Sequence, residues 1–182
     1  MDNNEYFSVN YQCSVNVQRL TESESVPDEV TFASEIPAPF LVSSEAAHID
    51  SAALRSLRNI GEYSQDLAEY LKMQSRKIDV IMGYVLSLQD DASERFQTTS
   101  ISGSAITYTS TKALNVGDHA RLKIFLPEES VAIYAYAQVK AVEMQNDLYT
   151  ISLDLIRMRE TDQEHLIRAT LHIQTRQLKE RK

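Results

Sequence analysis

Cysteine is almost absent from this sequence. Cys13 is the one cysteine among 182 residues, and there is no tryptophan. A single cysteine excludes an internal disulfide and a cysteine-rich metal site. Cys13 falls on the apolar side of an alternating segment with no candidate base beside it. We therefore expect a small buried side chain rather than a nucleophile.

Positive charge is also scarce. The chain has 18 Lys and Arg against 26 Asp and Glu, a net charge of −8, whereas general binding to nucleic acid or to a membrane surface needs clustered basic residues. No apolar run approaches the roughly 20 residues that span a bilayer, and the first residues, Met-Asp-Asn-Asn-Glu, are unlike a secretory signal. We expect a cytoplasmic protein with no nucleic-acid partner and no membrane insertion.

Catalytic patterns are missing as well. No Ser-His-Asp, P-loop or paired-carboxylate arrangement stands out. Of the four histidines, His165 and His172 are seven residues apart on an expected helix, whereas zinc sites use closer pairs with further ligands. The sequence therefore predicts no enzyme, no catalytic residue, no metal and no cofactor.

The chain does contain a long apolar heptad repeat within residues 51–89, which we predict to be one helix. With Leu57 as position a, eight of the ten a and d positions are apolar, and Ser64 and Gln74 are the polar exceptions. Such a helix would span about 58 Å at about 1.5 Å per residue, which a small domain cannot cover, so we predict an oligomerisation element. The residues assigned to it are Leu57, Ile60, Leu67, Leu71, Gln74, Ile78, Ile81, Val85 and Leu88.

The positions that flank the a and d residues favour an assembly of more than two helices. Uncharged residues occupy e positions, namely Gly61, Ala68, Ser75 and Met82. Isolated polar core residues cost stability but can fix register and strand number. The core does not separate a dimer from a tetramer, or a parallel from an antiparallel order. A single helix folded on its own domain is the alternative.

Most of the remaining chain is expected to form strands. Residues 1–42 contain one or two alternating strands and a short helix with Asp28 as its N-cap. Residues 95–158 alternate apolar and polar side chains in several short segments, with an Asn-Asp hairpin signal. Strands at this spacing without intervening helices predict an antiparallel barrel or sandwich. Residues 160–182 are expected to form a final helix.

Four weak motifs, in this order, resemble a PilZ domain. They are Thr98 to Gly103 (TTSISG), Gly117 to Pro127 (GDHARLKIFLP), Val139, and Tyr149 to Leu155 (YTISLDL). With the heptad segment between the first strands and the rest, the layout is similar to the atypical, tetrameric PilZ type. The resemblance implies one α+β domain over residues 1–182: a small antiparallel PilZ-like β-barrel with a C-terminal helix and a long coiled-coil helix.

PilZ domains typically bind the bacterial second messenger cyclic di-GMP, and the resemblance implies which residues would take part. Ser100 and Gly103 match the family's D/N-x-S-x-x-G strand, but Thr98 replaces its Asp or Asn, and no R-x-x-x-R segment occurs. Arg95 could supply one phosphate contact. Because a bidentate arginine contact to a base is worth about 1–3 kcal/mol, these losses predict weak or absent binding. Ser100 and Gly103 would then only shape a turn between strands.

Two function classes follow from the resemblance. The first is an oligomeric adaptor or scaffold, a homotetramer in the resemblance, that binds protein partners in cyclic di-GMP signalling. The second is a genuine cyclic di-GMP receptor in which a non-standard set of arginines, some from a neighbouring subunit, rebuilds the ligand site. A structural coiled-coil protein unrelated to the messenger is a third interpretation.

Overall fold

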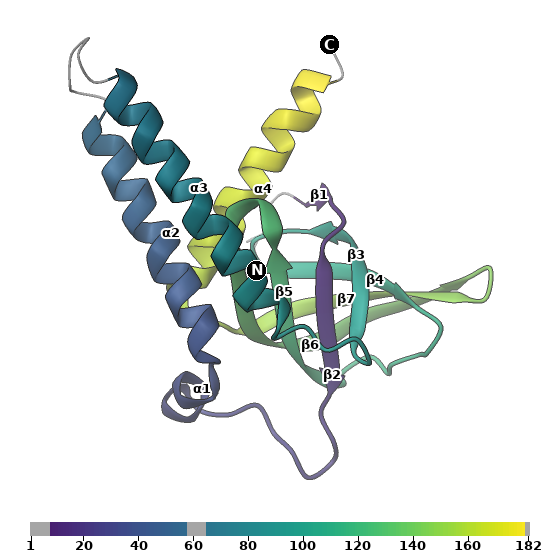
Figure 1. Cartoon of the computed structure of the whole chain (residues 1–182). Helices are drawn as coiled ribbons and strands as arrows, with labels where there is room; N and C mark the ends of the chain where they lie inside the picture. Colours follow the sequence, from purple (N-terminus) through teal and green to yellow (C-terminus); the bar gives the residue numbers. More distant parts are fainter. Residues whose placement is uncertain (1–7, 58–64, 181–182) are drawn as a thin grey trace, which may run out of the picture.

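Helices and strands occupy separate parts of the molecule, as expected for an α+β fold (Figure 1). The computed structural model describes residues 8–57 and 65–180. In chain order its elements are β1 (Val9–Asn10), β2 (Ser14–Arg19), α1 (Glu29–Glu35), α2 (Ala38–Leu57), α3 (Gln65–Ser87), β3 (Arg95–Ile101), β4 (Ala105–Ser110), β5 (His119–Leu126), the short 3-10 helix η2 (Pro127–Glu129), β6 (Val131–Gln145), β7 (Leu148–Arg157) and α4 (Glu160–Glu180).

The strands close into an antiparallel barrel. Their order is β3-β2-β5-β6-β7-β4, and pairing between β3 and β4 closes the ring, while β1 adds to β3. The β6–β7 hairpin turns at Asn146 and Asp147, with φ of 50° and 63°. These left-handed backbone angles match the right-handed twist of the strands that the turn joins. The sequence prediction of a barrel and of this hairpin is confirmed.

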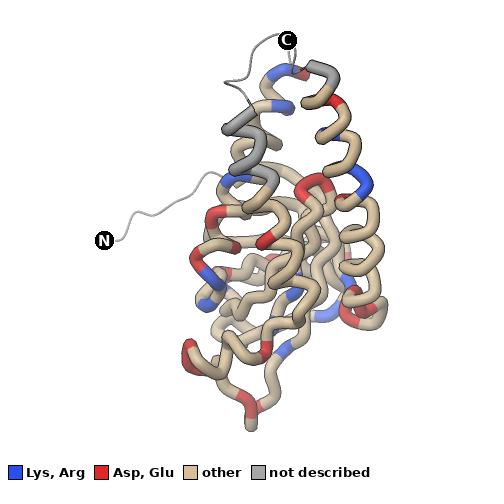
Figure 2. Tube along the Cα trace, turned by 60° about the vertical axis from the view of Figure 1, so that its left-hand side comes forward, with Lys and Arg blue, Asp and Glu red and all other residues tan. Residues whose placement is uncertain are grey.

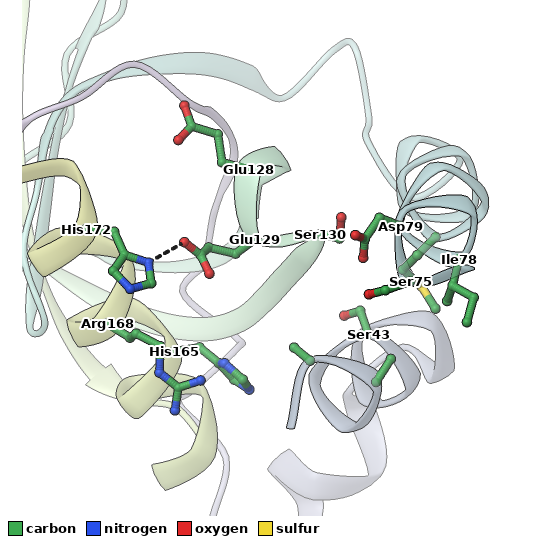
Figure 3. Close-up of a pocket in the computed structure, with 13 residues that line it drawn as sticks. Ser43, Ser75, Ile78, Asp79, Glu128, Glu129, Ser130, His165, Arg168 and His172 are labelled. Atoms are coloured by element: carbon green, nitrogen blue, oxygen red, sulfur yellow. Dashed lines mark hydrogen bonds and ion pairs between the residues drawn. The ribbon is translucent and has the colours of Figure 1, made fainter. Parts of the chain in front are cut away.

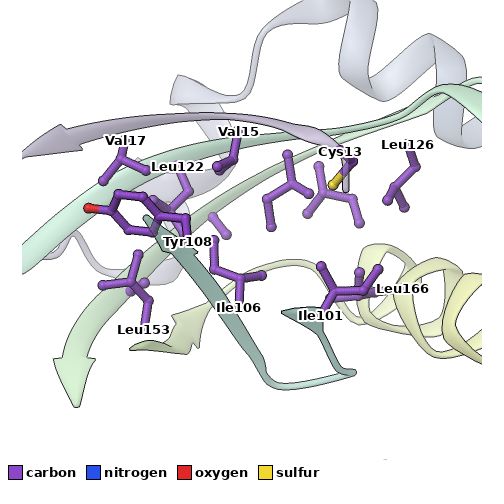
Figure 4. Packing of buried hydrophobic residues seen from close by; sticks show 14 of the residues in the cluster. Cys13, Val15, Val17, Ile101, Ile106, Tyr108, Leu122, Leu126, Leu153 and Leu166 are labelled. Carbon is purple, nitrogen blue, oxygen red and sulfur yellow. The ribbon is translucent and has the colours of Figure 1, made fainter. Parts of the chain in front are cut away.

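One face of each strand fills the barrel. Figure 4 shows side chains from opposite strands meeting there, among them Val15, Ile106 and Leu122, each at most 1% exposed. Leu166 on α4 belongs to the same cluster, so the C-terminal helix is part of the barrel core. Cys13 is buried in this cluster too, as expected.

A second apolar cluster lies outside the barrel, under the N-terminal helices. It joins Phe32 of α1, Phe40 of α2 and Leu86 of α3 to Phe125 and Tyr134 of the barrel. The first seven residues of β6 are buried in succession because one face points into the barrel and the other lies under the helices. This second cluster attaches the helical layer to the barrel.

The prediction of one continuous helix over residues 51–89 is wrong. Helices α2 and α3 pack side by side as a hairpin, here called the helical arm (Figure 1). Leu57 is the last residue of α2 and does not extend the repeat along α3, while Ile60 lies outside the described residues. Two helices in a hairpin must each bury an apolar face, so their period is the same as that of one long helix. The repeat alone could not separate the two structures.

The predicted N-cap of the short N-terminal helix is confirmed, whereas the first helix of the arm begins well before the predicted residue 51. Asp28 is the N-cap of α1, and its carboxylate accepts from the Thr31 amide at 2.8 Å. Helix α2 begins at Ala38, so it includes the end of the segment predicted for residues 1–42. Pro39 lies in its first turn, where the missing N–H has no helical partner to lose. Within the described residues, no helix combines the length and apolarity that crossing a bilayer demands.

Candidate functional site

The apolar seam of α3 is open to solvent in the single chain. By seam we mean the residues of the predicted repeat that lie on α3, namely Leu67, Leu71, Gln74, Ile78, Ile81 and Val85, together with Leu88, which directly follows the helix. Its large aliphatic side chains are 40–65% exposed at five positions, Leu67, Leu71, Ile78, Ile81 and Leu88. Gln74 and Val85 are partly buried. A row of this length on one helix is far larger than the scattered apolar residues of an ordinary surface.

A different face of α3 packs within its own chain. Leu86 is 5% exposed in the second core cluster, with Met82 packed against that cluster. Ala68, Ser75 and Met82 are partly buried and, at intervals of seven, fall on the same side of the helix. The uncharged e positions therefore lie on the side that contacts the chain's own α2, and five of the a and d positions are left exposed.

Thr98, the first residue of the predicted ligand motif, is bound to the protein itself. Its side chain is 1% exposed overall, and its hydroxyl donates to the Tyr11 carbonyl at 2.8 Å and accepts from the Cys13 amide at 3.0 Å. The register of β3 against β4 shifts between Thr98 and Ser100. The hydroxyl therefore satisfies backbone groups beside this irregularity.

The structure does not bring the four predicted ligand residues into one site. Arg95 begins β3, and its guanidinium pairs with Asp90 at 2.8 Å. Gly103 is in the turn after β3, where its carbonyl accepts from Gln163 at 3.4 Å. The two ends of β3, six residues apart, are separated by about 20 Å at about 3.3 Å per residue. Ser100 lies between them and pairs in register with residues of both β1 and β4.

A cavity of about 290 Å³ lies at the base of the helical arm, and sequence reasoning missed it. Figure 3 shows His165 and His172 of α4 on one side of it and Asp79 of α3 on the other, with η2 above and α2 below, and Arg168 of α4 also lines it. His172 contacts Glu129 at 3.1 Å. The lining comes from four separate elements, so no local motif could have indicated it.

Two acidic side chains beside this cavity pair with side chains of α4. Arg176 of α4 pairs with Glu128 at 2.7 Å, in parallel with the contact between His172 and Glu129. Burial and the nearby Arg168 lower the pKa of His165. Among the described residues, no three His, Cys, Asp or Glu side chains are arranged to hold a metal ion. These pairs join α4 to the β5–β6 connection.

Acidic and basic residues are interspersed along the described trace (Figure 2). Several are paired across the barrel surface, including Arg19 with Asp118 at 3.0 Å and Lys140 with Asp154 at 3.4 Å. Four arginines of the barrel strands therefore have acidic partners, namely Arg19, Arg95, Arg121 and Arg157, whereas the exposed seam of α3 is apolar.

The chain was compared with protein families, curated protein sequences and solved structures, and only solved structures gave matches. No family model and no curated protein sequence matches the chain. Its structure is similar to a tetrameric PilZ domain of Xanthomonas campestris described as self-assembled through an unusual helical bundle. That match has a TM-score of 0.58 and 14% identity, and it covers 96% of this chain and 91% of the other.

A second match is the inhibitor of motility MotI/DgrA of Bacillus subtilis, with a TM-score of 0.51 and 15% identity. The match covers 100% of this chain, which spans 55% of the Bacillus protein. At these identities the likeness is one of fold. The chain has a PilZ-like fold: a closed barrel, a C-terminal helix packed into it, and a helical arm that departs from its side.

Proposed function

We propose that the protein is an oligomeric adaptor of cyclic di-GMP signalling, in which the seams of several α3 helices pack together and hold the barrels around a shared helical bundle. The exposed seam is the observation that carries this proposal. Fully burying one Leu or Ile side chain contributes about 1.5–3 kcal/mol, and these five are already about half buried, so each contributes about half of that and together they still drive association. The similarity to a tetrameric PilZ domain built through a helical bundle favours four copies.

Direct binding of cyclic di-GMP is weak or absent in this proposal. The Thr98 hydroxyl is occupied by backbone groups, and Arg95 is paired with Asp90. Arginine forks that pair with guanine edges and phosphates carry much of such recognition. The adaptor would then contribute to signalling through protein partners that bind the barrels.

The assembly is tested by Leu71→Asp combined with Ile78→Asp. Analytical ultracentrifugation of the unaltered protein should give a tetramer, and the double variant should give monomers with an unchanged far-UV spectrum. Val116→Asp is the control, because Val116 is an apolar residue at least as exposed as Leu71 and Ile78 but lies in a barrel loop, and it should leave the tetramer intact. An unaltered protein that sediments as a monomer at high concentration rules out the proposed bundle.

Calorimetric titration of cyclic di-GMP into the tetramer tests the second part. We expect no heat of binding at micromolar concentrations. A dissociation constant in the low micromolar range would instead support a receptor whose arginines come from outside the recognised motif, some of them from a neighbouring subunit.

A further inference from the structure

Helix α3 has a second exposed apolar stripe that the seam does not include. Tyr70, Met73, Val80 and Tyr84 are 54–69% exposed, and the exposed Lys77 lies among them. These residues occupy g and c positions of the same repeat, and we call them the g/c stripe. A bundle that buried the a and d positions alone would leave this stripe in water.

Helical geometry separates α3 into three faces. At about 100° per residue, the e positions that face the chain's own α2 lie on one side of the seam, and the g positions lie on the other. In a ring with cyclic symmetry, the seam points to the axis and each α3 has a neighbour on both flanks. The e flank already carries α2, so the next subunit presents its α2 rather than a bare α3. The contact is heterologous and repeats around the ring.

Helix α2 presents a matching outer stripe. Val42 and Ile49 are 55% and 58% exposed, and the exposed Glu45 lies between them on the same side of the helix. Ser43 and Ser44, on the opposite side, are buried. This outer α2 stripe is therefore apolar at both ends and acidic in the middle, whereas the g/c stripe is apolar at both ends and basic in the middle.

The two stripes also lie at the same height along the arm. Ser43 and Ala46 of α2 line the same cavity as Ser75 and Asp79 of α3, which places Glu45 level with Lys77 in the sequence between those α3 residues. A rotation about the bundle axis leaves height unchanged. In such a ring, Glu45 of each subunit would therefore lie level with Lys77 of its neighbour.

We propose that the g/c stripe of each subunit packs on the outer α2 stripe of the next copy, with Lys77 and Glu45 paired across every such contact. The occupant of the stripe is a second copy of this chain, and the assembly has α3 helices at its centre and α2 helices around them. This inference rests on the proposed bundle and adds a second contact to it.

Charge reversal tests the contact. Lys77→Glu and Glu45→Lys should each weaken tetramer association by about tenfold or more, because each reversal puts like charges opposite one another in every repeat of the ring. The double reversal should restore association to near the unaltered value. The loss in each single variant should shrink at 1 M salt, where charges are screened beyond about 3 Å. Arg76→Glu, an equal change one residue earlier but at an f position, is the matched control and should have little effect.

Sedimentation equilibrium separates the outcomes. Rescue by the double reversal supports the contact. If each single reversal leaves association unchanged while Leu71→Asp with Ile78→Asp gives monomers, the seam bundle stands and the second contact is wrong. If the double reversal is as weak as the singles, the pairing of Lys77 with Glu45 is wrong. If neither the seam variants nor the charge reversals change association, the proposed bundle itself fails.

Discussion

The side-chain amide of Asn16 donates a 2.8 Å hydrogen bond to the Asp90 carboxylate, although the two residues are 74 positions apart. The same amide donates to the Asp91 carbonyl at 3.0 Å, and its oxygen accepts from the Asp91 amide at 2.9 Å. Asn16 is on β2, and Asp90 follows α3. One buried side chain therefore joins the end of the helical arm to the barrel.

Asn16→Ala should lower the free energy of unfolding by about 2–3 kcal/mol, because it removes three hydrogen bonds and leaves the Asp91 amide without this acceptor. Urea denaturation at one fixed protein concentration measures the change, since the stability of an oligomer depends on concentration. Gln145→Ala, on an exposed position of β6, should change stability by at most about 0.5 kcal/mol. Equal effects of the two substitutions would show that the Asn16 contacts contribute little.

The barrel could be predicted from the sequence. The helical arm and the contact between Asn16 and Asp90 that joins it to the barrel could not. Strands such as β5 bury alternate residues, and that period of two is visible in any one chain. The seam of α3 was also visible, because its repeat does not depend on which element it contacts. No sequence pattern indicates the hydrogen bond between Asn16 and Asp90, because each is a polar residue of a kind that is common on protein surfaces. The hairpin was missed because two packed helices and one long helix share a period.

The predicted ligand motif shows the same limit. A Thr in a strand gives no indication of whether its hydroxyl faces a ligand or the backbone. In the structure Thr98 is buried against Tyr11 and Cys13, and this depends on the pairing of β3 with the N-terminal segment. The predicted ligand residues therefore lie along β3 and the turn that follows it, with Thr98 turned toward the backbone of the N-terminal segment.

Thr98→Val should lower the free energy of unfolding by about 1–2 kcal/mol, since the Tyr11 carbonyl and the Cys13 amide each lose a partner. Thr98→Asp, which restores the acidic residue of the family motif, should cost about 3 kcal/mol or more, because it buries a carboxylate beside a carbonyl oxygen. Urea denaturation measures both changes.

Calorimetry on the Thr98→Asp variant should still detect no cyclic di-GMP binding. Thr99→Val is the control, because Thr99 is exposed and adjacent, and it should be nearly neutral. Binding gained with Thr98→Asp, without loss of stability, would show that this position faces a ligand.

Stability should depend on pH through His165. Burial lowers the pKa of this histidine in the folded protein, and Arg168 and Arg159 lower it further, while Asp162 raises it. The unfolded chain takes up the proton near the ordinary pKa of about 6.5. Stability is therefore fully present above that pH and is lost as pH falls from about 6.5 toward the lower folded-state pKa.

His165→Gln should flatten this pH dependence. One proton gives a slope of at most about 1.4 kcal/mol per pH unit, so urea denaturation at pH 7.5, 6.5 and 5.5 resolves the difference. Gln145→Ala, at an exposed position of β6, removes no titratable group and should keep the unaltered slope. Parallel curves for the unaltered protein and the His165 variant would mean that this histidine titrates alike in both states.

Helix α1 is joined to the barrel through Tyr136, whose hydroxyl donates to Glu35 at 2.5 Å and accepts from Arg121 at 3.1 Å. The Arg121 guanidinium also lies 5.6 Å from the centre of the Tyr136 ring. Tyr134 donates to the same Glu35 carboxylate at the longer distance of 3.3 Å. The two tyrosines therefore offer a matched comparison of a short and a long hydrogen bond to one carboxylate.

Tyr136→Phe should lower the free energy of unfolding by about 1.5–3 kcal/mol, the range for a hydrogen bond to a charged group, while the ring keeps its contact with Arg121. A double-mutant cycle with Glu35→Ala isolates the pair. The coupling energy should exceed the one from the parallel cycle of Tyr134→Phe with Glu35→Ala, because the bond from Tyr134 is longer. If the Tyr134 cycle gives the larger coupling, then Tyr134 rather than Tyr136 is the main link between α1 and the barrel.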